Sequence, residues 1–116
     1  MEPLRVWEKL SSPQKIDRDS GILLVHEGLE ASNDALRQNQ IEQYRGIISQ
    51  TLMEDVSWEK KLALLELSGV LSNYSNEQCV YKESIAKFLE DPEVRVRIAA
   101  GEYLGVICRK FHLLQN

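Results

Sequence analysis

The 116-residue chain has few of the residues that interrupt helices or cross-link small folds, with three prolines and two cysteines. The cysteines, Cys79 and Cys108, are too few for a disulfide framework and too far apart to form a zinc-binding set. We therefore expect a protein of a reducing compartment that is stabilised by its hydrophobic core.

Long apolar runs are also absent. No stretch reaches the roughly 18 consecutive apolar residues that a membrane-spanning helix needs. The first ten residues include four charged ones, so they lack the uninterrupted apolar core of a secretory signal. These absences predict no association with membranes and a cytoplasmic or nuclear location.

Basic residues are in the minority, with 14 against 18 acidic residues and a net charge of -4. This balance disfavours a broad nucleic-acid-binding face, which needs basic side chains to neutralise phosphates. The 43% of hydrophobic and 28% of charged residues are typical of a folded globular chain. The length suits one domain over residues 1–116, built around a single core.

The sequence predicts an all-α fold, because strand signals are nearly absent and several helix starts can be recognised. Proline is tolerated at the first position of a helix, and a preceding serine or aspartate can cap it. The starts predicted in this way lie at Ser12-Pro13 and Asp91-Pro92. Two more are indicated by Ser57 and by the capping box of Ser75 with Gln78.

Two segments have the apolar spacing of amphipathic helices. In the helix predicted over residues 33–53 the apolar stripe consists of Ile41, Tyr44, Ile48 and Leu52. In the second helix it consists of Tyr81, Ile85, Phe88 and Leu89. The second stripe looks like a copy of the first.

An alignment of the chain with itself reveals an internal repeat. At a shift of 37 residues Tyr44 aligns with Tyr81, and Ile48 with Ile85. At a shift of 36 the next segment aligns Asp55 with Asp91, Lys61 with Arg97, Ala63 with Ala99, Glu66 with Glu102 and Gly69 with Gly105. A period of this length with two helices is typical of stacked helical hairpins. The expected units span approximately residues 1–32, which is partial, 34–73 and 76–113.

Residues 91–107 resemble the second helix of a HEAT repeat. HEAT repeats belong to the armadillo-like helical class. The residues that carry the resemblance are Asp91, Pro92, Val96, Arg97, Ala100 and Leu104. In the preceding unit Asp55, Lys61 and Leu64 match the same pattern, whereas Lys60 and Ser68 depart from it. The resemblance covers residues 34–113 well and the N-terminal third poorly.

This resemblance implies a right-handed α-solenoid of antiparallel helix pairs, with about three units of which the first is partial. The second helix of each pair would line an inner, concave face. Proteins of this class act as scaffolds or adaptors that bind other proteins, and occasionally nucleic acid. The resemblance also implies that Lys61 and Arg97 bond to the turn aspartates, Asp55 and Asp91, of neighbouring units.

A narrow polar stripe on the second helices is the candidate partner-binding site. It consists of Glu59, Glu66 and Asn73 in one unit and Arg95, Glu102 and Arg109 in the next. Because the residues within each helix are seven apart, they form adjacent rows on one face. The alternative interpretation is a solvated helix face without a partner.

A second hypothesis is a nucleic-acid-binding helical repeat. It would use a local basic patch consisting of Lys60, Lys61, Arg95, Arg97, Arg109 and Lys110. The acidic net charge makes this the weaker of the two functions. Its signature would be retention on DNA or RNA that falls steeply with salt.

Catalysis finds little support in the sequence, and we expect neither an enzyme nor a bound metal or cofactor. His26 is followed by Glu27, but the second histidine of a metalloprotease motif is missing. Cys108 and His112 share a helix face, yet two ligands do not complete a zinc site.

The C-terminal helix stays apolar almost to its end, with Phe111, Leu113 and Leu114. Helical-repeat arrays usually carry polar caps at their ends. We therefore expect a segment of a longer repeat protein, or self-association through uncapped ends. Gly101 and Gly105 are expected to let a neighbouring helix approach closely.

Overall fold

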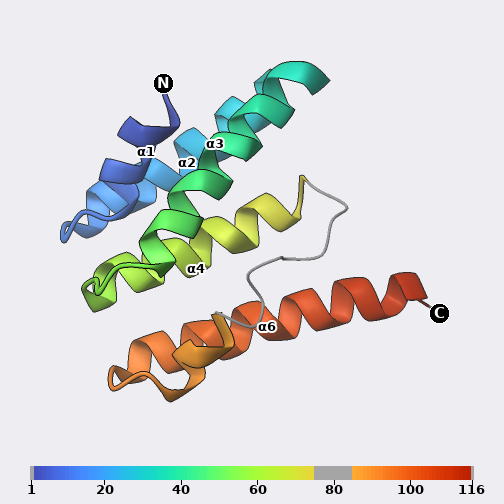
Figure 1. Ribbon diagram of the computed structural model, residues 1–116. Coiled ribbons are helices and arrows are strands. Elements are labelled where there is room, and N and C mark those ends of the chain that lie inside the picture. Colours follow the sequence, from blue (N-terminus) through green and yellow to red (C-terminus); the bar gives the residue numbers. More distant parts are fainter. Residues whose placement is uncertain (1, 75–84, 116) are drawn as a thin grey trace.

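The structure is a computed structural model that describes residues 2–74 and 85–115 (Figure 1). Beyond Ile107, Arg109 is the only residue whose side chain it describes. Its helices are α1 (Pro3–Leu10), α2 (Lys15–Ala31), α3 (Asp34–Leu52), α4 (Trp58–Ser72), the 3-10 helix η1 (Lys87–Glu90) and α6 (Val94–Gln115). These two segments contain no strand, so the all-α fold is confirmed. The helix start predicted at Ser75 lies outside the described residues.

Two helices begin at a side-chain cap, of which Ser57 was predicted from the sequence and Asn33 was not. The side chain of Asn33 accepts a hydrogen bond from the backbone N–H of Leu36 at 2.9 Å, and α3 follows directly. Ser57 accepts from the backbone N–H of Lys60 at 3.4 Å, at the start of α4. Such caps satisfy amide groups that have no partner inside the helix.

The second predicted amphipathic helix does not end as an α-helix. Lys87–Glu90 is a 3-10 helix, and Leu89 is 45% exposed although it was expected in the apolar stripe. The cause is Pro92, since the residue before a proline avoids the helical region. Asp91 is accordingly extended, with ψ of 143°. Ile85 is buried as predicted, whereas Tyr81 lies outside the described residues.

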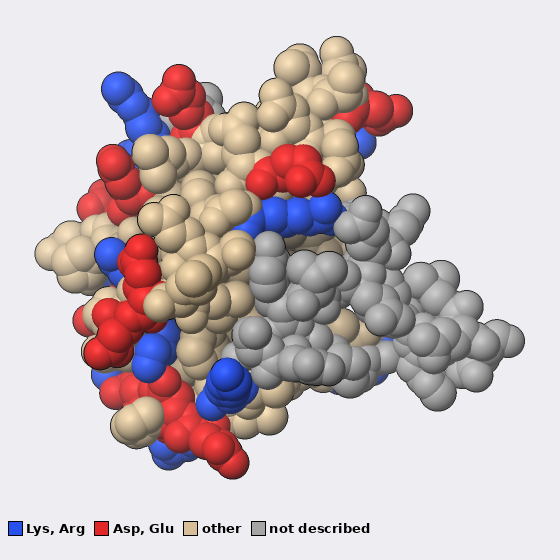
Figure 2. All heavy atoms as spheres, viewed as in Figure 1, with Lys and Arg blue, Asp and Glu red and all other residues tan. Residues whose placement is uncertain are grey.

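The helices form two layers. In one layer α1 contacts α3, and in the other α4 contacts both α2 and α6. Each of the pairs α1–α2 and α3–α4 is also in contact. The turns that precede α2, α4 and α6 lie along one edge, at the left of Figure 1. Many acidic and basic side chains gather along this edge (Figure 2).

One hydrophobic cluster joins the layers. Its fully buried side chains include Leu10, Leu29, Tyr44, Leu64, Leu67, Ile85 and Val96. Burying a large apolar side chain of this kind stabilises the fold by about 1.5–3 kcal/mol. Burial also raises the pKa of Tyr44 to about 12.

Gly21 allows α1 and α2 to approach closely. A Cβ atom at this position would lie 3.1 Å from the backbone nitrogen and from side-chain carbons of Leu10. Any larger residue would therefore push the two helices apart. None of the described helices is both long and apolar enough to cross a membrane.

Candidate functional site

The turns before α2 and α6 have the same local structure. The side chain of Ser12 accepts a hydrogen bond from the backbone N–H of Gln14 at 3.1 Å. The side chain of Asp91 accepts from the backbone N–H of Glu93 at 3.0 Å. In both cases the acceptor precedes a proline and the donor is two residues further on, which is the geometry of a side-chain-stabilised turn.

An arginine closes each of these turns from the following helix. Arg18 donates from one guanidinium nitrogen to the carbonyl oxygens of Ser12 and Pro13, at 3.0 and 2.8 Å. Arg97 donates in the same way to the carbonyls of residues 91 and 92, at 2.6 and 3.1 Å. The two turns therefore correspond residue by residue at a shift of 79.

This correspondence fixes the register of the first unit, which the sequence left open. Gly21 corresponds to Ala100, and both are buried. Val25, which is buried, corresponds to Leu104, which is half-buried. Helices α2 and α6 thus carry equivalent positions. The alignment of the sequence at a shift of 36 residues adds the equivalent positions of α4.

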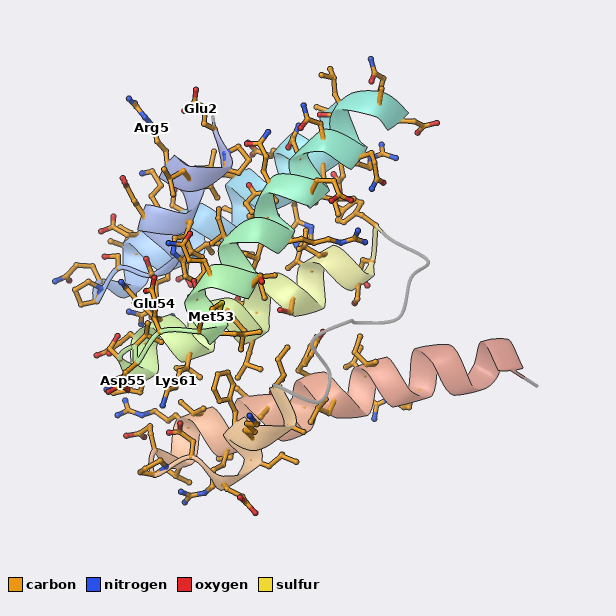
Figure 3. The ribbon with its side chains drawn as sticks, viewed as in Figure 1. Glu2, Arg5, Met53, Glu54, Asp55 and Lys61 are labelled. Atoms are coloured by element: carbon orange, nitrogen blue, oxygen red, sulfur yellow. The ribbon has the colours of Figure 1, made fainter. Side chains whose placement is uncertain are left out.

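A charged pair links α4 to the turn before α6. The ammonium group of Lys61 binds the Asp91 carboxylate at 2.5 Å, and their side chains are 21% and 7% exposed. Figure 3 shows Lys61 pointing from α4 toward the segment that leads into α6. Burial alone would raise the pKa of Asp91, but the bonds from Lys61 and from the backbone N–H of Glu93 hold it below its usual value.

Of the bonds expected to the turn aspartates, the one between Lys61 and Asp91 is therefore confirmed. The same prediction is wrong for Arg97, whose bonds go to the carbonyls of its own turn. Asp55 is exposed, and within the described residues it joins no ion pair.

The polar stripe begins with a contact between α4 and α6. The guanidinium carbon of Arg95 lies 3.7 Å from the centre of the Trp58 ring, a cation–π arrangement. Its Nε donates to the Glu93 carboxylate at 2.8 Å. This bond raises the pKa of Arg95, and the charge of Glu59 adds to the effect.

Further along α4, Glu66 is near α2. Partial desolvation raises the pKa of Glu66, the negative charge of Asp19 raises it further, and Arg18 opposes both. The remaining residues of the predicted site are Asn73, Glu102 and Arg109; all three are exposed, and in the described part of the chain they join no ion pair.

The register of the first unit adds three positions that sequence reasoning missed. On α2, Ile16, Leu23 and Glu30 correspond to Arg95, Glu102 and Arg109. Ile16 is 80% exposed and Leu23 is 63% exposed, which is unusual for large apolar side chains. The spacing from Ser12-Pro13 to Arg18, repeated at Asp91-Pro92 and Arg97, was the signal that could have found them.

We call these nine equivalent positions on α2, α4 and α6 the ridge. Its residues are Ile16, Leu23, Glu30, Glu59, Glu66, Asn73, Arg95, Glu102 and Arg109. On α2 the ridge has two apolar residues and Glu30, on α4 it has two acidic residues and Asn73, and on α6 it is mixed in charge. A surface of this composition can bind another chain.

Groups that could hold a metal ion are not brought together in the described residues. Those residues contain no cluster of three or more histidine, cysteine, aspartate or glutamate side chains. The Nδ1 of His26 lies 3.1 Å from the hydroxyl of Tyr74, which donates to the Glu30 carboxylate at 2.9 Å. The side chains of Cys108 and Lys110 lie outside the described part.

Comparisons of the chain with protein-family models, curated proteins and solved structures gave no match.

Proposed function

We propose that the chain is a non-catalytic scaffold or adaptor that binds another protein through the ridge. In this proposal it is a right-handed HEAT-like or armadillo-like α-solenoid of about three units, the first partial, and a segment of a longer repeat protein. Its location is cytoplasmic or nuclear.

The repeat architecture is supported by the turns. Two of them share a side-chain cap, a proline and an arginine bonded to two carbonyls. In the unit between them, Lys61 occupies the arginine position and binds forward to Asp91. Units that contact only their neighbours are the defining property of solenoids.

The observation that carries the binding function is the exposure of Ile16 and Leu23. These side chains lie seven residues apart on one face of α2, with Asp19 between them on the same face. Glu66 of the neighbouring helix adds a second negative charge close to Asp19. Exposed apolar groups rimmed by charges are typical of surfaces that bind proteins.

The basic patch of the alternative function has less support. Lys61 is bound to Asp91, Arg95 is held by Glu93 and Trp58, and Arg97 binds backbone carbonyls. Cations that already have protein partners must break these bonds before they can neutralise phosphates. Retention on duplex nucleic acid that falls with salt would nevertheless support this alternative over protein binding.

The test is capture of partners by a matched pair of variants. Leu23→Glu changes the ridge, whereas Leu36→Glu makes the same substitution on α3, at a position that is 55% exposed. Proteins bound by the wild type are identified by mass spectrometry after crosslinking. We expect the Leu36→Glu variant to retain them and the Leu23→Glu variant to lose them by about tenfold or more.

A second comparison uses charge. The double reversal of Glu66→Lys and Glu102→Lys changes the acidic part of the ridge without touching the core. Circular dichroism first establishes that each variant is folded. If the ridge variants captured the same proteins as the wild type in the same amounts, the proposed function would be wrong.

A further inference from the structure

The exposed face of α2 alternates apolar and acidic side chains. Ile16, Asp19, Leu23 and Glu27 follow one another at steps of three and four residues, so they lie in one row along the helix. All four are exposed, and Ile16 and Leu23 are the apolar members of the ridge. Leu23 therefore has one carboxylate a turn before it and another a turn after it.

The carboxylates beside this row are available to a cation from another molecule. Glu27 and Glu66 join no ion pair in the described part of the chain. Asp19 pairs with Lys15 at 3.7 Å, but their side chains are 65% and 81% exposed, and such a surface pair is weak. Partial desolvation and the charge of Asp19 raise the pKa of Glu66. Arg18 opposes this effect, yet it is already bonded to the carbonyls of its turn.

The sign of these charges selects the class of partner. Nucleic acids and anionic membranes would set phosphates against Asp19, Glu27 and Glu66, and like charges repel. A polypeptide with lysine or arginine beside apolar residues complements both parts of the row, because its cations meet the carboxylates while its apolar side chains cover Ile16 and Leu23.

The spacing of the apolar side chains indicates the conformation of the partner. Leu23 lies seven residues after Ile16, which is about 10 Å along the helix. A partner helix that runs along α2 presents side chains seven apart at the same distance. On one face of a β-strand the side chains are about 7 or 14 Å apart, and neither distance matches. Extended segments commonly bind to the edge of a sheet, and residues 2–74 and 85–115 contain no strand.

We propose that the α2 part of the ridge binds a basic amphipathic helix of another protein. Apolar residues seven apart in that helix cover Ile16 and Leu23, and its lysine or arginine side chains face Glu27 of α2 and Glu66 of α4. This binding mode rests on the protein-binding function proposed above and adds the chemistry and the conformation of the partner.

The test uses three synthetic peptides of about 18 residues, a length that allows several helical turns. The first carries leucines at heptad spacing with lysines beside them. In the second serine replaces every leucine, and in the third glutamate replaces every lysine. Fluorescence anisotropy measures their binding to the full chain, and circular dichroism measures helix formation. We expect the first peptide to bind, to become helical and to lose affinity as salt rises, and the other two to bind about tenfold more weakly or less.

Matched variants locate the binding on the ridge. Leu23→Ser, Glu27→Lys and Glu66→Lys are each expected to raise the dissociation constant of the first peptide by about tenfold or more. Leu36→Ser and Glu42→Lys make the same changes at exposed positions of α3 and should bind the peptide as the wild type does. Because Glu42→Lys and Glu66→Lys change the net charge equally, their comparison removes the general effect of charge. If one ridge variant failed to fold, the other two would still decide.

Several results would overturn the proposal. They are no measurable binding of the first peptide, equal binding of the serine or glutamate peptide, equal losses in the variants of α2 and α3, and binding to vesicles of anionic lipid in place of the peptide. Failure of the protein-binding function has a different signature, namely ridge variants that capture the same proteins as the wild type. Partners that are lost with Leu23→Glu but crosslink through an acidic or extended segment would support that function and contradict the basic helix.

Discussion

The ammonium group of Lys61 on α4 binds the carboxylate of Asp91, 30 residues later in the chain, at the turn that leads into α6. The bond therefore ties α4 to the turn that leads into the next long helix. The Asp91 side chain is 7% exposed, so its charge is separated from most of the solvent. A buried carboxylate of this kind becomes costly when its cation is removed.

The first prediction concerns this pair. Lys61→Met should lower the free energy of unfolding by about 2–4 kcal/mol, because it leaves the Asp91 carboxylate buried without a cation. Adding Asp91→Asn should recover part of the loss, which a double-mutant cycle in urea measures. Lys15→Met is the control, since it removes an ion pair whose side chains are 81% and 65% exposed. Equal losses for Lys61→Met and Lys15→Met would contradict the structural role of the pair.

The second prediction concerns acid. Because the pKa of Asp91 is lower in the folded protein than in the unfolded chain, its ionisation stabilises the fold above the unfolded value of about 4. This stability should be lost as the pH falls from there through the folded pKa. In Asp91→Asn the decline of stability with acid should be shallower, as urea unfolding between neutral and acidic pH can measure. Asp55→Asn, at an exposed position, should keep the wild-type slope.

The third prediction compares two glycines inside helices. Gly46 in α3 has open space around its Cα, so Gly46→Ala should raise the free energy of unfolding by about 0.5–1 kcal/mol through better helix propensity. Gly21→Ala gains the same propensity but forces a Cβ to 3.1 Å from Leu10. This substitution should lower the free energy of unfolding by about 1–2 kcal/mol, because the destabilisation from overpacking exceeds the gain in helix propensity. Thermal unfolding of both variants tests whether they change the stability of the fold in opposite directions.

Much of the fold was predictable because its signals are local. Asn33 and Ser57 cap the helices that follow them, and the spacing of Ile41, Tyr44 and Ile48 marks the buried face of α3. These features depend on helical geometry and on the hydrogen bonds of the first turn, which the sequence determines within a few residues.

The register of the first unit has only a weak sequence signal, the spacing from Ser12-Pro13 to Arg18 that recurs from Asp91-Pro92 to Arg97. It depends on Arg18, whose bonds to two carbonyls become visible only when the turn is folded. If α2 is not aligned with α6, Ile16 and Leu23 cannot be distinguished from ordinary core residues. The apolar pattern of a helix does not reveal which of its faces remains uncovered. The predicted polar stripe was therefore incomplete on α2.

The fourth prediction separates binding from folding at Glu66. The pKa of this carboxyl is raised in the folded protein by partial desolvation and by the charge of Asp19. Ionisation of Glu66 therefore weakens the fold, and the contribution of its neutral form is lost as the pH rises through the folded pKa. At neutral pH Glu66→Gln should leave stability unchanged or raise it slightly, by up to about 0.5 kcal/mol.

If the ridge binds a protein, the same substitution should weaken capture of the partners that Leu23→Glu also loses. A residue that reduces stability and increases binding is typical of functional surfaces, whereas a structural residue changes both in the same direction. Unfolding in urea and quantitative capture, both on one preparation of Glu66→Gln, measure the change in stability and the change in binding. A loss of stability together with unchanged capture would assign Glu66 to the fold and remove it from the ridge.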